Sequence, residues 1–126
     1  MDSIEVTILR NLLFNNEYCR KVLPFIKLDY FENFHEKVLF DEMSKFITTY
    51  DSLATKEVLL IEAEKRTDIT EDTYKIICDY MSNLDDAPAD KQWLVDTTEK
   101  WCKDRALYLA LMESIKIADG QDEKKS

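Results

Sequence analysis

Residues 90–118 read DKQWLVDTTEKWCKDRALYLALMESIKIA and contain neither glycine nor proline. Because those two residues are the usual helix breakers, the stretch predicts one uninterrupted helix. A helix of that length spans about 42 Å. A globular chain of 126 residues has a diameter of about 36 Å. We therefore expect this helix to cross the whole domain or to protrude from it.

Within this predicted helix, residues 106–112 (ALYLALM) are apolar on every side of two helical turns. A helix that is apolar all round must be buried all round. In so small a domain we expect the extra cover to come from another chain, which makes this region a predicted self-association surface. The alternative is that the earlier helices of the same chain wrap it completely.

In the part of the chain before this stretch, apolar periodicity and helix-capping residues predict five shorter helices. The predicted fold class is therefore all-α. One glycine and two prolines in 126 residues also argue against sandwich, barrel and Rossmann folds, which need glycine in their turns. We expect the helices over about 3–14, 16–23, 33–50, 55–66 and 70–84. The last of these and the long helix are expected to form a protruding antiparallel hairpin beyond a small globular bundle.

The predicted organisation is one helical domain over residues 1–119, because the chain is too short for a second core. We divide it into globular helices over 1–68 and a helical hairpin over 70–118. Residues 120–126 are small and charged, and they are expected to be a tail or the start of an interdomain linker.

The net charge and the cysteines limit the classes of partner and the compartment that we expect for this chain. Seventeen basic against 26 acidic residues give a net charge of −9, so we expect no direct contact with nucleic acid, whose phosphates would repel the domain. The sequence shows no apolar run long enough to span a membrane and no signal peptide. Three cysteines without paired spacing indicate core residues in a reducing compartment, and hence a cytoplasmic protein.

The motifs of catalysis and cofactor binding are missing from the sequence. Gly120 is the only glycine, which excludes a phosphate-binding glycine loop. His35 is the only histidine; it begins H-E-x-x-L rather than the H-E-x-x-H of a zinc protease, and we expect it to be a surface or helix-terminal residue. We therefore predict no catalytic residue, no metal and no cofactor in this chain.

The chain resembles the N-terminal domain of the DnaB-type hexameric replicative DNA helicases. Among these it is most similar to the helicases of T-even-like phages. The resemblance covers residues 4–118. The residues that carry it are Asn15-Asn16-Glu17-Tyr18, Lys21-Val22-Leu23-Pro24, Asp29-Tyr30-Phe31, the run from Asp90 to Val95, Thr98-Glu99-Lys100-Trp101 and Arg105-Ala106. The run around Trp93 and the Thr-Glu-Lys segment are the most specific of these.

The resemblance implies a non-catalytic collar domain that associates with other subunits into dimers or higher oligomers and docks primase and other replisome proteins. It also implies that ATP and magnesium belong to a separate C-terminal motor domain, and that a phage-encoded chain would act in the cytoplasm of the host cell. Arg105 matches an arginine of the family, although a structural salt bridge is an equally good explanation. The residues predicted for the subunit or partner contact are Ile77, Tyr80, Met81, Trp93, Leu94, Trp101, Arg105, Tyr108 and Met112.

Two other functions remain open from the sequence. One is a free-standing helical adaptor or inhibitor that mimics this collar and binds a host or phage partner. The other is a small enzyme or metal-binding bundle, which would have to carry a stoichiometric metal.

Overall fold

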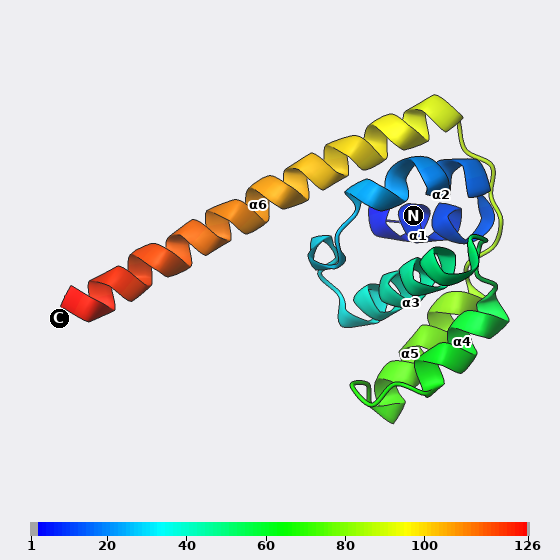
Figure 1. The fold of residues 1–126 in the computed structure, drawn as a ribbon, viewed down its shortest axis with the longest axis horizontal. Coiled ribbons are helices and arrows are strands. Elements are labelled where there is room, and N and C mark those ends of the chain that lie inside the picture. The colour runs from blue at the N-terminus through cyan, green and yellow to red at the C-terminus, as the bar shows by residue number, and fades with distance from the viewer. Residues whose placement is uncertain (1–2, 126) are drawn as a thin grey trace.

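The computed structural model describes residues 3–125, with side chains over residues 3–120, and shows an all-helical fold (Figure 1). No strand occurs among the described residues, which confirms the predicted fold class. Two short 3-10 turns, η1 and η2, connect the second helix to the third. The elements are α1 Ile4–Phe14, α2 Asn16–Val22, η1 Leu23–Phe25, η2 Leu28–Tyr30, α3 Phe34–Tyr50, α4 Lys56–Glu64, α5 Glu71–Ser82 and α6 Lys91–Lys125.

Polar side chains fix where most of the helices begin. A side-chain oxygen just before the first turn accepts a backbone amide that the helix itself leaves unpaired. This occurs at the starts of α1, α2, α4 and α5, where the capping residues are Ser3, Asn15, Thr55 and Thr70. Asp90 caps α6 in the same way, with Oδ1 2.8 Å from the amide of Trp93.

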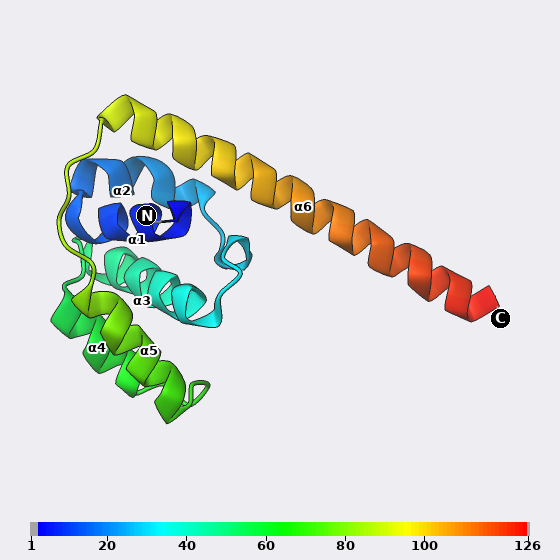
Figure 2. The same ribbon diagram turned by 180° about the vertical axis from the view of Figure 1, so that it is seen from behind.

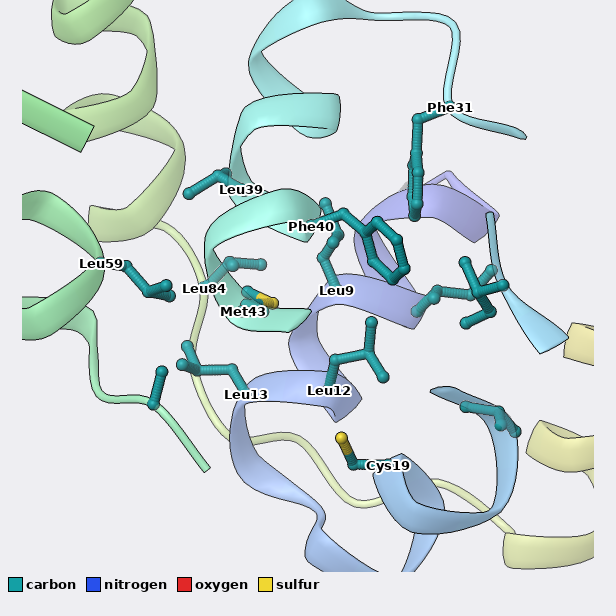
Figure 3. Packing of buried hydrophobic residues seen from close by; sticks show 14 of the residues in the cluster. Leu9, Leu12, Leu13, Cys19, Phe31, Leu39, Phe40, Met43, Leu59 and Leu84 are labelled. Atoms are coloured by element: carbon teal, nitrogen blue, oxygen red, sulfur yellow. The ribbon is translucent and has the colours of Figure 1, made fainter. Parts of the chain in front are cut away.

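The helices α1 to α5 form one globular body. Helix α1 lies at its centre, with α2 and α3 against it, and α4 and α5 pack on α3 (Figures 1 and 2). Helix α6 lies across α2 and α1, on the side of the body away from α4 and α5. Figure 3 shows leucines of α1 meeting Phe40 and Met43 of α3 in the core, with Phe31 alongside.

Helices α5 and α6 do not form the predicted hairpin. Ile77 and Met81 of α5 are buried because α5 packs on α3 and α4. Residues 83–90 contain no helix, and eight extended residues span up to about 26 Å; this segment carries the chain from α5 to the start of α6 near α2. Leu84 is buried and anchors the segment at its beginning. Helix α5 therefore belongs to the globular body, and no boundary falls between residues 68 and 70.

Helix α6 extends far beyond the body, as its length predicted (Figures 1 and 2). It is continuous from Lys91 through Gly120 to Lys125. The backbone therefore does not break at Gly120, where the sequence suggested a tail or linker. The side chains of residues 121–126 lie outside the described part of the chain.

Candidate protein-association surface

The first half of α6 is fixed to the body by a buried hydroxyl pair and a tryptophan. The Tyr18 hydroxyl and the Thr98 hydroxyl lie 2.7 Å apart in the interior, and burial raises the pKa of Tyr18 above its usual value. The Trp101 ring packs 5.0 Å from Phe31 and edge-on at 5.9 Å from Tyr30. These contacts set the direction in which α6 leaves the body.

Arg105 is the next residue that ties α6 to the body. Its Nε donates to the backbone carbonyl of Tyr30 at 2.6 Å, and its guanidinium pairs with Glu32 at 3.1 Å. It also lies over the ring of Tyr108, 4.8 Å from the ring centre. Arg105 therefore forms the structural salt bridge that the sequence left as an alternative.

Beyond Arg105 the helix loses the cover of the body. We call residues 106–118 the overhang. Leu107, Leu111 and Ile115 are 61%, 56% and 53% exposed, and Ile117 is similarly exposed. Tyr108 and Met112 are also exposed, whereas Leu109 is half-buried against the body. The earlier helices therefore do not wrap residues 106–112: the described part of the chain covers Leu109 in part and leaves the other large side chains of this run exposed.

The apolar side of the overhang continues the side of α6 that packs on the body. Leu94, Trp101, Tyr108 and Ile115 recur every seven residues, so they lie along one side of the helix. The first two are buried in the body and the last two are exposed. A surface of this size and apolarity on a small protein is typical of a protein-association site.

Four of the predicted contact residues are not available to a partner. Ile77, Met81, Leu94 and Trp101 are buried in the core of this chain. The sequence prediction was wrong for them because apolar periodicity shows that a face is buried without showing what buries it. Tyr80 is half-buried, and its hydroxyl donates to Glu36 at 2.8 Å, beside the ring of His35.

The other predicted residues stay candidates. Trp93, Tyr108 and Met112 are all exposed on α6. The prediction omitted Leu107, Leu111 and Ile115, which are more exposed than Tyr108 and Met112. For Leu107 and Leu111 the signal was already in the sequence, because both lie in the run 106–112, which is apolar on every side. Ile115 lies beyond that run.

A groove lies beside the buried half of α6, between that helix and the end of α2. Its cavity measures 380 Å³ and its walls include Val22, Phe25, Val95 and Cys102. Burial raises the pKa of the Cys102 thiol to about 11, so this thiol is protonated at neutral pH and unreactive. The three cysteines are free.

The negative charge of the chain is unevenly distributed. Residues 33–90 hold fourteen acidic and six basic side chains, which is −8 of the total of −9. Residues 91–120 hold five of each sign and are neutral. The candidate surface on α6 therefore lies on a part of this acidic molecule that has no net charge.

Neither a metal site nor a membrane-spanning helix is found in the described residues. No three His, Cys, Asp or Glu side chains gather there in a way that could hold a metal ion. None of the described helices combines the length and apolarity needed to cross a bilayer. That the chain carries no metal and no cofactor stays a prediction.

Comparison with known proteins gives the chain a relative. Over 110 residues it is 33% identical to the DnaB-like replicative helicase of Enterobacteria phage T4. The chain is homologous to the N-terminal part of that helicase. This confirms the resemblance found in the sequence. The match covers 87% of this chain and 23% of the T4 helicase, so the chain spans about a quarter of its relative. No family model matches the chain.

Proposed function

We propose that this chain is a non-catalytic collar domain of a replicative DNA helicase, in which it associates with other subunits and docks primase and other replisome proteins. The homology to the N-terminal part of the T4 DnaB-like helicase supports this role. ATP and magnesium then belong to a motor domain outside the described residues.

The overhang is the observation that carries the proposal. Six large apolar side chains stand exposed on three helical turns that no other described element covers: Leu107, Tyr108, Leu111, Met112, Ile115 and Ile117. A patch of this kind has an area on the order of 500 Å². Two such patches facing each other approach the roughly 1,200 Å² at which specific interfaces begin.

The charge distribution supports protein partners rather than DNA. A surface that binds phosphates needs clustered lysine and arginine, whereas residues 33–90 are strongly acidic and α6 is neutral up to Gly120. The domain is therefore suited to bind proteins near DNA without binding the DNA itself.

Self-association is the part of the proposal that this chain can test alone. We expect sedimentation equilibrium to show oligomers whose population rises with concentration in the micromolar range. Leu111→Glu should weaken association at least tenfold, because a buried charge without a partner is costly. Ile61→Glu is the matched control, since Ile61 is 47% exposed on α4 and should leave association unchanged. A chain that stays monomeric at every concentration would contradict the proposal.

A further inference from the structure

The groove between the first half of α6 and the end of α2 is apolar in its interior. Val22 and Cys102 line it and are 5% and 8% exposed. Thr98 also lines it, but its hydroxyl is already paired with that of Tyr18 at 2.7 Å. The volume of 380 Å³ lies near the lower end of the range of about 300–1,000 Å³ that is usual for ligand pockets. The groove therefore has room for a few side chains of a ligand, and the part of the ligand that enters it must be apolar.

Phe25 stands beside this groove on a rigid support. It is 70% exposed, the largest fraction among the large apolar side chains of the described residues. Pro24 before it has a fixed φ, and Ile26 after it is buried, with its amide bonded to the carbonyl of Leu23 at 3.3 Å. An exposed aromatic ring on a rigid support is typical of a binding hot spot, because little conformational entropy is lost when a partner packs against it.

Two lysines from different helices line the groove, Lys21 of α2 and Lys103 of α6. Lys103 pairs with Glu99, which also lines the groove, at 3.1 Å. Lys21 lies 3.8 Å from Glu17, whose closer partner is Lys91 at 3.1 Å. Two lysines and one glutamate give the groove a charge of +1, in a chain whose net charge is −9. The groove is therefore a basic site on an acidic molecule.

The acidic residues on the far side of the body have little effect at this groove. Helix α6 lies on the side of the body away from α4 and α5 (Figures 1 and 2). At physiological salt, the interaction between exposed charges is screened over about 8 Å. A negatively charged ligand is therefore attracted by the two lysines more strongly than it is repelled by the distant carboxylates, whereas a basic ligand would be repelled by the lysines.

We infer that this groove binds an acidic segment of a partner protein. One large apolar side chain of the segment packs against Phe25, and carboxylates of the segment lie beside Lys21 and Lys103. Exposed ion pairs are individually weak, so the apolar contact supplies most of the affinity and the charges determine which segments bind. This inference rests on the proposed role of the chain in docking replisome proteins, and it adds the place and the chemistry of one docking site.

Selection from a random peptide library tests the chemistry of the ligand. Displayed peptides are selected on the immobilised chain and counter-selected on the Phe25→Ser variant, so that peptides bound elsewhere are removed. The retained peptides should carry aspartate or glutamate on both sides of a large apolar residue. Retention of basic or uncharged peptides, or of none above background, would overturn the inference.

Two lysine variants then test the groove with one retained acidic peptide, by fluorescence titration. Lys103→Glu should raise the dissociation constant of the peptide about fivefold. Lys100→Glu is the matched control, because Lys100 is equally exposed on α6 and pairs with Asp104 at 3.0 Å, as Lys103 does with Glu99, but does not line the groove. It should change the constant less than about twofold. Equal effects would show that the net charge of the chain controls binding, and would overturn the inference.

Sedimentation equilibrium of the groove variants separates this inference from the proposed self-association. Phe25→Ser and Lys103→Glu should leave association of the chain unchanged, because the groove lies beside the docked half of α6 and not beside the overhang. Peptide binding to a chain that stays monomeric would support the groove while contradicting the proposed self-association. Loss of association in Phe25→Ser would mean that a second copy of the chain occupies the groove, and would overturn the inference.

Discussion

Arg66 is the side chain whose charge does most to hold a loop of the body in place. Its guanidinium reaches Asp41 at 2.8 Å, Glu42 at 2.7 Å and Asp68 at 2.6 Å, and it is only 16% exposed. It thereby fixes the end of α4 and the loop before α5 to the middle of α3. A single lysine amine could not reproduce this forked geometry.

Replacing Arg66 should destabilise the domain in a pH-dependent way. We expect Arg66→Gln to lower the free energy of unfolding by about 2 kcal/mol at neutral pH, because it removes the closer ionic partner of the nearly buried Glu42 and leaves it only Lys45 at 3.9 Å. Burial alone would raise the pKa of Asp41, but its hydrogen bonds with Arg66 and Lys45 outweigh burial and lower that pKa. The carboxylate therefore stabilises the fold above the ordinary aspartate pKa, and this contribution is lost as the pH falls through and below about 4.

The measurement is urea unfolding of both proteins at about pH 7 and about pH 3.5. The difference in unfolding free energy between wild type and Arg66→Gln should shrink at the lower pH. Arg66→Lys should lie between the two proteins at neutral pH. A difference that stays the same at both pH values would show that the ion pairs contribute nothing and that packing alone explains the loss.

At the level of whole elements, the docking of α6 depends on one of its two tryptophans. Trp101 packs on Phe31 and Tyr30, and its indole NH donates to Glu5 at 3.3 Å. Trp101→Ala should therefore lower the free energy of unfolding by about 3 kcal/mol, as is usual for deleting a buried aromatic ring. Trp93 is 52% exposed on the same helix, and Trp93→Ala should change stability by less than about 0.5 kcal/mol.

The comparison is best made by urea unfolding followed by far-UV circular dichroism at one protein concentration. Equal losses in the two tryptophan variants would mean that α6 rests on the body through a different side from the one described. Loss in Trp93→Ala alone would reverse the assignment of buried and exposed faces along the whole helix.

These two tryptophans show what the sequence could and could not predict. Helix existence follows from local information, namely capping residues and the spacing of apolar side chains, and all six helices were found in that way. Which side of α6 is buried depends on Tyr30 and Phe31, aromatic residues that lie outside the α-helices and far away in the sequence. The spacing of apolar residues within α6 does not show which distant residues the helix contacts. Trp93 and Trp101 were therefore equal candidates for a partner contact, although one is exposed and the other is buried.

The predicted hairpin was wrong for a related reason. Helix α5 has a well-defined apolar face, and neighbours in sequence are usually neighbours in space. The apolar face of α5 instead packs on α3 and α4, and residues 83–90 carry the chain to the other side of the body. By contrast, the prediction that residues 106–112 need more cover than one body gives agrees with their exposure, because a run that is apolar on every side cannot be buried by one body on one side.

In the molecule as a whole, the first half of α6 packs on the globular body and the second half extends beyond it. The described hydrogen bonds from α6 to other elements end at Arg105, and Leu109 is the last described apolar side chain packed on the core. Isolated helices of about a dozen residues are marginal in water. The overhang of a lone copy should therefore open far more often than the docked half of the same helix.

Hydrogen exchange monitored by mass spectrometry should divide α6 at about Arg105. In a dilute sample, amides over 94–102 should be strongly protected and amides over 107–118 should exchange rapidly. Raising the concentration into the range where the chain associates should slow exchange in the second segment and leave the first unchanged, because only the second gains a partner. Leu111→Glu should remove the concentration dependence. Protection of 107–118 that is already complete in a dilute, monomeric sample would mean that the overhang is stable without a partner, and its exposed apolar side chains would then need another explanation.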